Sequence, residues 1–395
     1  MSIKFRKSVF GSTLLISGCC IGAGILGLPL VSFSSGFFFS LIPLIISWSY
    51  MYLSGLMLLE IYIGEKKNIN LTGLLKNTLG DRGIIIVAGL FLFLFYSILT
   101  AYFNASSIII QDSIKSVFKI DISQTFTLII NGLFLFFIIL FKTRKIDFIN
   151  RFLVFIMIFF YLCLVGLGSF QVNLENLTTS HNVNTIIYAM PVFIVSFGYQ
   201  NLIPTISHYL NYDIKSIKSA IFRGTILSLI VYLIWNFIIL GMISNKSLSM
   251  TESNTIFITR LFKYSSPMIM FLINNFAFFA IITSLLTVSL SFVNFLSDSA
   301  ESQKNRAFYT ACTIIPPVIF SLIDTNIFLL ALKLAGGIGT ISLFGILPAM
   351  MLWKTRYITK KQYKKIFPFS KKVLSIYILT SIALIIMGMI NIIFY

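Results

Sequence analysis

The chain has 395 residues, of which 57% are hydrophobic and only 11% are charged, and its mean hydropathy is +0.95. A folded soluble domain needs a polar exterior, so this composition excludes a soluble protein and predicts an integral membrane protein. The net charge of +18 does not indicate a nucleic-acid partner, because the Lys and Arg residues stand in short segments between apolar runs, where they act as topology signals.

Eleven apolar segments are long enough to cross a bilayer. A span needs about 20 apolar residues, and a helix bonds its own backbone polar groups where no water is present. We therefore expect an all-α integral membrane fold with spans at 9–32, 37–63, 84–110, 126–141, 148–170, 186–209, 220–243, 267–296, 307–323, 327–353 and 373–393.

The basic residues predict the orientation of these spans. Most of the 30 Lys and Arg residues fall in alternate loops, on the side of the membrane that also holds the N-terminus. Cytoplasmic loops carry such an excess of positive charge. The N-terminus is therefore expected in the cytoplasm and the C-terminus outside.

Two of the predicted spans carry helix-breaking residues near their middles. These residues are Gly22, Gly24, Gly27 and Pro29 in the first span, and Gly198 and Pro204 in the sixth. Glycine and proline weaken a helix, so we expect both spans to unwind there, next to protein or a water-filled cavity. Because spans one and six hold corresponding places in two five-helix halves, the pair is typical of transporters built from inverted repeats. Close packing of glycines between unbroken helices is the alternative.

Three stretches resemble one family. They are GSTLLISGCCIGAGILGLPL at 11–30, SFGYQNLIPTISHYL at 196–210 and FFAIITSLLTVSLSFVNFLSD at 278–298, and the span that contains Trp235 and Asn236 agrees with them. Across essentially its whole length the chain resembles the bacterial aromatic amino acid permeases, which are tyrosine- and tryptophan-specific carriers. That family often has an acidic residue where this chain has Asn294.

The resemblance implies a LeuT-type fold with five plus five inverted helices and one extra helix. The first repeat would cover 1–170, the second 186–353 and the extra helix 373–393, with helices one and six broken. It also implies a protein of the bacterial inner membrane that imports tyrosine or tryptophan by ion symport, with the proton as the coupling ion. The expected partners are the amino acid, the coupling ion and membrane lipid.

In this fold class the two breaks hold the substrate backbone. The resemblance therefore assigns substrate binding to Cys20, Ile21, Gly22, Ala23 and Gly24 in the first span and to Phe197, Gly198, Tyr199 and Gln200 in the sixth. On the third predicted span, Tyr96, Tyr102 and Asn104 are further candidates for the cavity wall.

Three other residues are candidates for ion coupling. Thr283 and Ser284 match the position where sodium-coupled relatives of the fold place two hydroxyl ligands, although both hydroxyl groups can also bond within their own helix. Lys333 lies inside the tenth span, where a charge indicates gating or coupling unless its side chain reaches the membrane surface. A lysine that replaces the cation belongs in the fifth span, which offers only Arg151 at its end, so proton and sodium both stay open.

Other functions find less support in the sequence. A membrane-embedded transferase needs convergent His, Asp or Glu side chains, which two histidines and 12 scattered acidic residues do not supply, so we expect no enzyme. The four cysteines lack metal-ligand spacing, and we expect neither a metal nor a cofactor. Glu60, near the cytoplasmic end of the second span, is expected either to reach the membrane surface or to pair with a loop. A carrier of another neutral or hydroxy amino acid remains the alternative within transport.

Overall fold

The computed structural model describes residues 2–22, 24–33, 35–65, 74, 78, 80–141, 143–178, 186–242, 266–299, 305–361 and 363–394. Throughout these ranges the regular structure is helical. The longer helices are α1 (Ser2–Cys20), α2 (Gly24–Phe33), α3 (Phe37–Gly64), α5 (Asp81–Phe118), α6 (Gln124–Ile139), α7 (Thr143–Gly168), α9 (Ile186–Ser196), α11 (Ile214–Met242), α13 (Pro267–Ser299), α14 (Arg306–Ile323) and α17 (Lys371–Phe394). The π-helix η5 (Ala335–Ile346), of 12 residues, joins α15 (Phe328–Leu334) to α16 (Leu347–Trp353). The remaining short helices are η1 (Ser169–Gln171), α8 (Leu174–Thr178), η3 (Gln200–Leu202), α10 (Ile203–Tyr209) and η6 (Lys354–Ile358).

Within the described ranges, nine helices or joined helical segments are long and apolar enough to cross a membrane. The number is ten when α1 and α2, which meet at a bend of 54°, are counted as one span. The shorter apolar helix α6 has 16 residues and coincides with the fourth predicted span. The chain is therefore an all-helical, multi-pass membrane protein.

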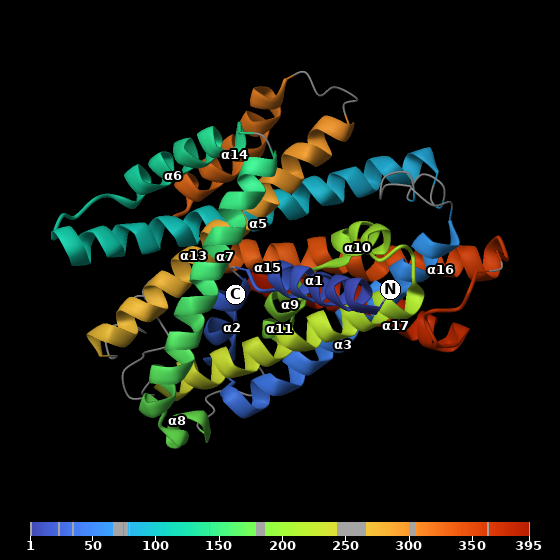
Figure 1. Cartoon of the computed structure of the whole chain (residues 1–395), viewed down its shortest axis with the longest axis horizontal. Helices are drawn as coiled ribbons and strands as arrows, with labels where there is room; N and C mark the ends of the chain where they lie inside the picture. The colour runs from blue at the N-terminus through green and yellow to red at the C-terminus, as the bar shows by residue number, and fades with distance from the viewer. Residues whose placement is uncertain are drawn as a thin grey trace.

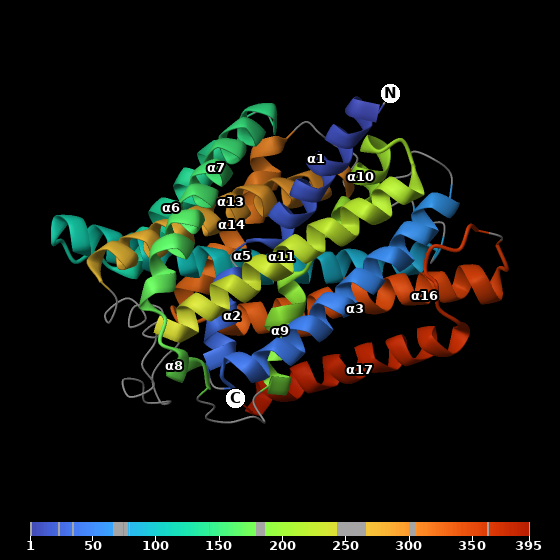
Figure 2. The same ribbon diagram turned by 60° about the horizontal axis from the view of Figure 1, so that its bottom comes forward.

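The helices form two neighbouring groups. In one group α5, α6, α13 and α14 pack against one another, and α7 lies along α13. In the other, α11 contacts α1, α2 and α3, and α9 contacts α2 and α3. The segment from α15 through η5 to α16 runs between them, touching α5, α9 and α3, while α17 lies along η5 (Figures 1 and 2). This arrangement brings the ends of α1 and α9 to the boundary between the two groups.

A buried ion pair fastens the end of α3 to the segment that leads to α17. Glu60 is 1% exposed, and its carboxylate accepts hydrogen bonds from Arg356 Nε at 2.6 Å and Nη2 at 2.7 Å. The backbone N–H groups of Ile366 and Phe367 donate to the same carboxylate at 2.7 and 2.8 Å. A buried carboxylate is tolerated only when it is paired and hydrogen-bonded in this way. The predicted pairing of Glu60 with a loop is confirmed.

Removing the charge of Glu60 should destabilise the protein strongly. Breaking one side of a buried ion pair costs about 3–5 kcal/mol, whereas an exposed pair contributes at most about 1 kcal/mol. We expect Glu60→Gln to lower the free energy of unfolding, measured in mixed detergent micelles, by an amount in the first range. The matched control is Asp121→Asn, which breaks the pair of Lys115 and Asp121, whose side chains are 59% and 69% exposed. Equal losses in the two variants would contradict this account of the Glu60 pair.

Candidate functional site

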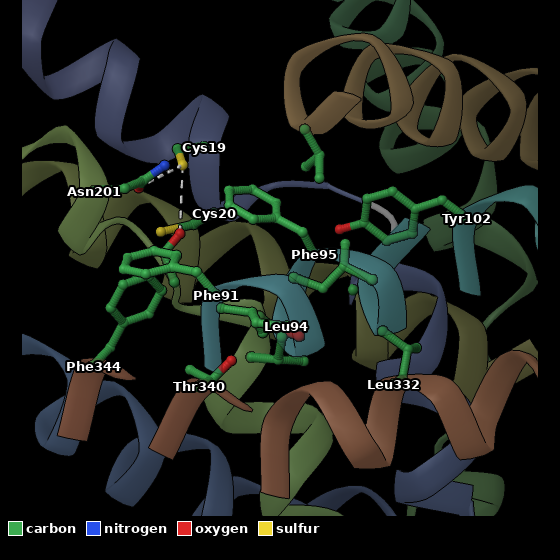
Figure 3. Close-up of a pocket in the computed structure, with 16 residues that line it drawn as sticks. Cys19, Cys20, Phe91, Leu94, Phe95, Tyr102, Asn201, Leu332, Thr340 and Phe344 are labelled. Carbon is green, nitrogen blue, oxygen red and sulfur yellow. Dashed lines mark hydrogen bonds between the residues drawn. The ribbon is translucent and has the colours of Figure 1, made fainter. Parts of the chain in front are cut away.

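One cavity of the protein lies between the ends of α1 and α9. Its volume is about 90 Å³. Cys19, Cys20 and Gly24 line it from the first span, and Val195, Ser196, Gly198 and Asn201 line it from the sixth. The other walls are apolar or aromatic except at Thr340, and consist of Phe91, Leu94, Phe95, Ile98 and Tyr102 of α5, Val288 of α13, Leu332 of α15, and Thr340 and Phe344 of η5 (Figure 3).

The wall from α5 follows from helical spacing. Phe91, Phe95, Ile98 and Tyr102 stand at intervals of four, three and four residues, which places them on one face of a helix. The ring of Phe344 meets that of Phe91 edge to face, with 6.4 Å between the ring centroids. These aromatic side chains form a surface suited to a planar apolar group.

The interrupted segments of the first and sixth spans touch each other. A Cβ atom added to Gly24 would lie 2.7 Å from Ser196 Oγ, so only glycine lets the start of α2 approach the end of α9 this closely. The thiol of Cys19 donates to the carbonyl oxygen of Gly198 at 3.4 Å, and its Sγ lies 3.9 Å from Asn201 Oδ1 (Figure 3). The two helix ends thus form one continuous wall of the cavity.

A tyrosine of a third helix joins the same two ends. The hydroxyl oxygen of Tyr232, on α11, lies 2.5 Å from the carbonyl oxygen of Cys20 and 2.7 Å from that of Ser196. Cys20 is the last residue of α1 and Ser196 the last of α9. The final carbonyl groups of a helix have no partner within it. The Tyr232 hydroxyl supplies one, and the backbone N–H of Gly22 also donates to the Cys20 oxygen, at 2.8 Å.

A second cavity, also of about 90 Å³, adjoins the first, and more of its lining residues carry hydroxyl groups. The two share Cys19, Phe95, Tyr102, Asn201 and Val288. The second is further lined by hydroxyl groups on one face of α13, and by the side chain of Asn150 on α7. The hydroxyl-bearing residues are Thr283, Ser284, Thr287 and Ser291.

The predicted coupling-ion residues lie beside the break of the first span. A Cβ on Gly22 would lie 2.6 Å from Ser284 Oγ. Thr283 and Ser284 each donate a hydrogen bond of 2.8 Å to a carbonyl of their own helix, as the alternative interpretation holds. Their oxygen lone pairs nevertheless remain acceptors, and both residues line the second cavity. In the part of the chain that the structure describes, no three His, Cys, Asp or Glu side chains gather as metal ligands would.

Four of the residues assigned to the breaks line one of the two cavities. Cys20, Gly24 and Gly198 line the first cavity and Ile21 the second, whereas Ala23 falls outside the described residues.

The remaining residues of the sixth-span break point elsewhere. Phe197 packs edge to face on Tyr232, with 5.2 Å between ring centroids. Tyr199 and Gln200 are fully buried, and the amide of Gln200 donates to the backbone carbonyl of Met51 on α3 at 3.1 Å. None of the three residues lines either cavity.

On α5 the structure separates the three predicted candidates. Tyr96 donates to the carbonyl of Cys312 at 2.9 Å, and Asn104 to that of Thr325 at 2.8 Å, so both serve contacts with the α14 region. Tyr102 instead lines both cavities. Lys333 follows the cavity residue Leu332 on α15, is half-buried, and lines neither cavity.

Sequence reasoning did not single out the aromatic wall. Phe91, Phe95 and Phe344 are three of 41 phenylalanines, so their residue type carried no signal. The helical spacing of the α5 residues indicates that they share one buried face. It does not indicate whether that face adjoins a cavity or another helix. Cys19 and Asn201 were adjacent to assigned residues and were not named as ligands.

Comparisons with known proteins agree on one family. The family model described as the tryptophan/tyrosine permease family matches residues 5–388. The chain is 29% identical to tyrosine-specific transport system 1 of Haemophilus influenzae, with 88% of each chain covered. It is 28% identical to the low affinity tryptophan permease of Escherichia coli, with 89% of this chain and 88% of the relative covered. It is also 26% identical to glutamine transporter 2 of Aliivibrio fischeri, over 83% of this chain and 84% of the relative.

Among solved structures, the chain is similar to Mhp1, a nucleobase-cation-symport-1 family transporter in a closed conformation with bromovinylhydantoin bound. The TM-score is 0.64 at 14% identity, and the match covers 97% of this chain and 90% of Mhp1. At this identity the likeness concerns the fold alone.

Proposed function

The chain belongs to the tryptophan/tyrosine permease family, and we propose that it imports tyrosine or tryptophan across a bacterial inner membrane by secondary active transport. Its family and relatives are transporters, so it is a membrane transporter and not an enzyme. The observation that carries the choice of substrate is the cavity between the two interrupted spans, whose walls include Phe91, Phe95 and Phe344. Aromatic rings gain from burial against one another beyond the area that they cover.

The proposed architecture has eleven spans, with α6 as the fourth. Residues 1–170 and 186–353 would form two inverted repeats of the LeuT type, with 373–393 as the extra helix. The positions of the two interruptions, in the first and sixth spans, support this division. The distribution of Lys and Arg supports an N-terminus in the cytoplasm and a C-terminus outside.

We propose that the amino acid lies with its charged groups against the two breaks. Its carboxylate would face the N-terminal end of α2, where backbone N–H groups and the helix dipole favour an anion. Its ammonium group would face the carbonyl oxygens at the ends of α1 and α9, which carry the opposite partial charge. Gly24, Cys20 and Ser196 line the cavity at these ends, which supports the placement. The ring would then lie among the aromatic side chains of α5 and η5.

The coupling ion is proposed to be the proton, with sodium as the alternative. A sodium ion would use Thr283 and Ser284 together with backbone of the first-span break, since hard cations prefer oxygen ligands. The close approach of Gly22 to Ser284 supports this pairing. For Lys333 the proposal remains a role in gating or coupling. A charged side chain is costly inside the bilayer, and the ionisable residues found there commonly serve a function.

A carrier of another neutral amino acid is the second candidate. The similarity to a protein named glutamine transporter 2 favours it. A site for the glutamine amide needs hydrogen-bonding partners, because buried polar groups left unpaired are costly. The apolar and aromatic walls of the first cavity favour an aromatic substrate instead.

Uptake by the purified protein in liposomes tests the function. We expect labelled tyrosine or tryptophan to accumulate against its gradient when an inward proton gradient is imposed, and unlabelled glutamine not to compete. Empty liposomes and a collapsed gradient are the controls. Accumulation under a sodium gradient alone would replace the proton by sodium. No accumulation of either aromatic amino acid under either gradient would sink the proposed function.

Loss of the Ser284 hydroxyl should uncouple transport from the ion gradient. A hydrogen-bond partner of a charged group contributes about 1.5–3 kcal/mol, which corresponds to about tenfold or more. We expect Ser284→Ala to lower gradient-driven accumulation about tenfold while substrate exchange between equal internal and external pools persists.

The matched control is Thr380→Ala, because Thr380 makes a similar hydrogen bond within its own helix but lines neither cavity. It should retain both accumulation and exchange. If Ser284→Ala loses accumulation and exchange in the same proportion, the hydroxyl has no separate role in coupling.

A further inference from the structure

The hydroxyl group of Tyr232 lies within hydrogen-bonding distance of the last carbonyl groups of two helices, α1 and α9. Its oxygen lies 2.5 Å from the Cys20 carbonyl oxygen and 2.7 Å from the Ser196 carbonyl oxygen. A phenol has one O–H to donate, so it cannot satisfy both carbonyl groups fully at once. The Cys20 oxygen also accepts a hydrogen bond from the backbone N–H of Gly22 at 2.8 Å. Because a carbonyl oxygen has two lone pairs, the Ser196 oxygen always keeps capacity for a further donor, and the Cys20 oxygen keeps it while the hydroxyl proton is turned to Ser196.

The surroundings keep this hydroxyl in place. Tyr232 is 0% exposed, and its ring is held edge to face by Phe197 at 5.2 Å. Its helix, α11, packs against α1 and α2 on either side of the first break. The hydroxyl therefore has no access to water as an alternative partner, and its position is fixed by the packing of its ring.

The two carbonyl groups belong to residues of the cavity wall. Cys20 and Ser196 both line the first cavity, and each ends a helix. Helix C-termini carry partial negative charge, and two of them converge here on one hydroxyl group. Spare acceptor capacity at such a point suits a donor that carries a positive charge.

We propose that Tyr232 is a positioning residue for the substrate's ammonium group: its shared hydrogen bond holds the Cys20 and Ser196 carbonyl oxygens together as the acceptor of that group. This inference rests on the proposed function, since it assigns a residue to the amino acid site. Tyr232 itself need not touch the substrate. It sets the separation and direction of the two carbonyl groups. These groups belong to the backbone, so no side-chain substitution at Cys20 or Ser196 would remove them.

The test compares each amino acid with an analogue that lacks only the amino group. Dissociation constants are measured on the full chain in lipid nanodiscs for L-tyrosine against 3-(4-hydroxyphenyl)propanoate, and for L-tryptophan against indole-3-propanoate. In the wild-type protein we expect the bound amino acid to be favoured at least about tenfold over its analogue, since hydrogen bonds to a charged group are the strong ones. Equal affinities would overturn the inference without any variant.

Tyr232→Phe should reduce this preference selectively. We expect the dissociation constant of the amino acid to rise about tenfold and that of the analogue to change less than about twofold. Phe197→Leu, which keeps the hydroxyl group but loosens its ring, should reduce the preference in the same direction by a smaller factor. The matched control is Tyr377→Phe, because Tyr377 also donates to a backbone carbonyl, that of Tyr50 at 3.0 Å, but its helix α17 lines neither cavity. It should leave both constants unchanged.

A merely structural role for Tyr232 predicts a different pattern. The dissociation constants of the amino acid and of its analogue would then rise by the same factor in Tyr232→Phe. This result overturns the inference about Tyr232 but leaves the proposed function intact. Failure of the wild-type protein to bind either aromatic amino acid would overturn the proposed function, and this inference with it.

Discussion

Inside a bilayer, every backbone N–H and C=O group must find a partner within the protein, and this constraint governs the two interrupted spans. At Ile21 and Gly22, and again at residues 197–199, the chain leaves helical geometry and gives up bonds that a continuous helix provides. The groups released there are served by one another and by side chains from other helices, notably Tyr232 and Cys19. In transporters of this architecture, backbone polar groups at such interruptions form hydrogen bonds with a small charged substrate, which lipid cannot provide.

Other helices form the walls of the cavities beside the two interrupted spans. The α5 group contributes a face of aromatic and aliphatic side chains, while α13 contributes a row of hydroxyl groups on the other side of Tyr102. An apolar compartment and a more polar one therefore adjoin at the same break. In the proposed function the amino acid occupies the first compartment and the coupling ion the second. The buried Glu60–Arg356 pair lies elsewhere, at the end of α3, and serves the anchoring of the last helices.

Much of this organisation could be predicted from the sequence because lipid imposes long apolar runs. Nine of the helical segments in the described ranges, or ten with α1 and α2 as one span, are long and apolar enough to cross a membrane, and the family resemblance is confirmed by the comparisons. Side-chain directions were harder to predict. Tyr96, Tyr102 and Asn104 share one helix, but only Tyr102 lines the cavities, because the other two bond to the α14 region. For Tyr199 and Gln200, which lie in irregular backbone, no periodicity predicts a direction, and the structure turns both toward α3. The role of Tyr232 depends on contacts 212 and 36 residues distant along the chain.

The most direct measurement is an electron cryomicroscopy structure of the protein in nanodiscs with L-tyrosine or L-tryptophan bound. The account predicts ligand density in the cavity between the first and sixth spans, with the carboxylate at the start of α2, the ammonium group at the Cys20 and Ser196 carbonyl oxygens, and the ring beside Phe91 and Phe95. Ligand density outside this cavity, or a first span that continues unbroken through residues 20–24, would contradict it.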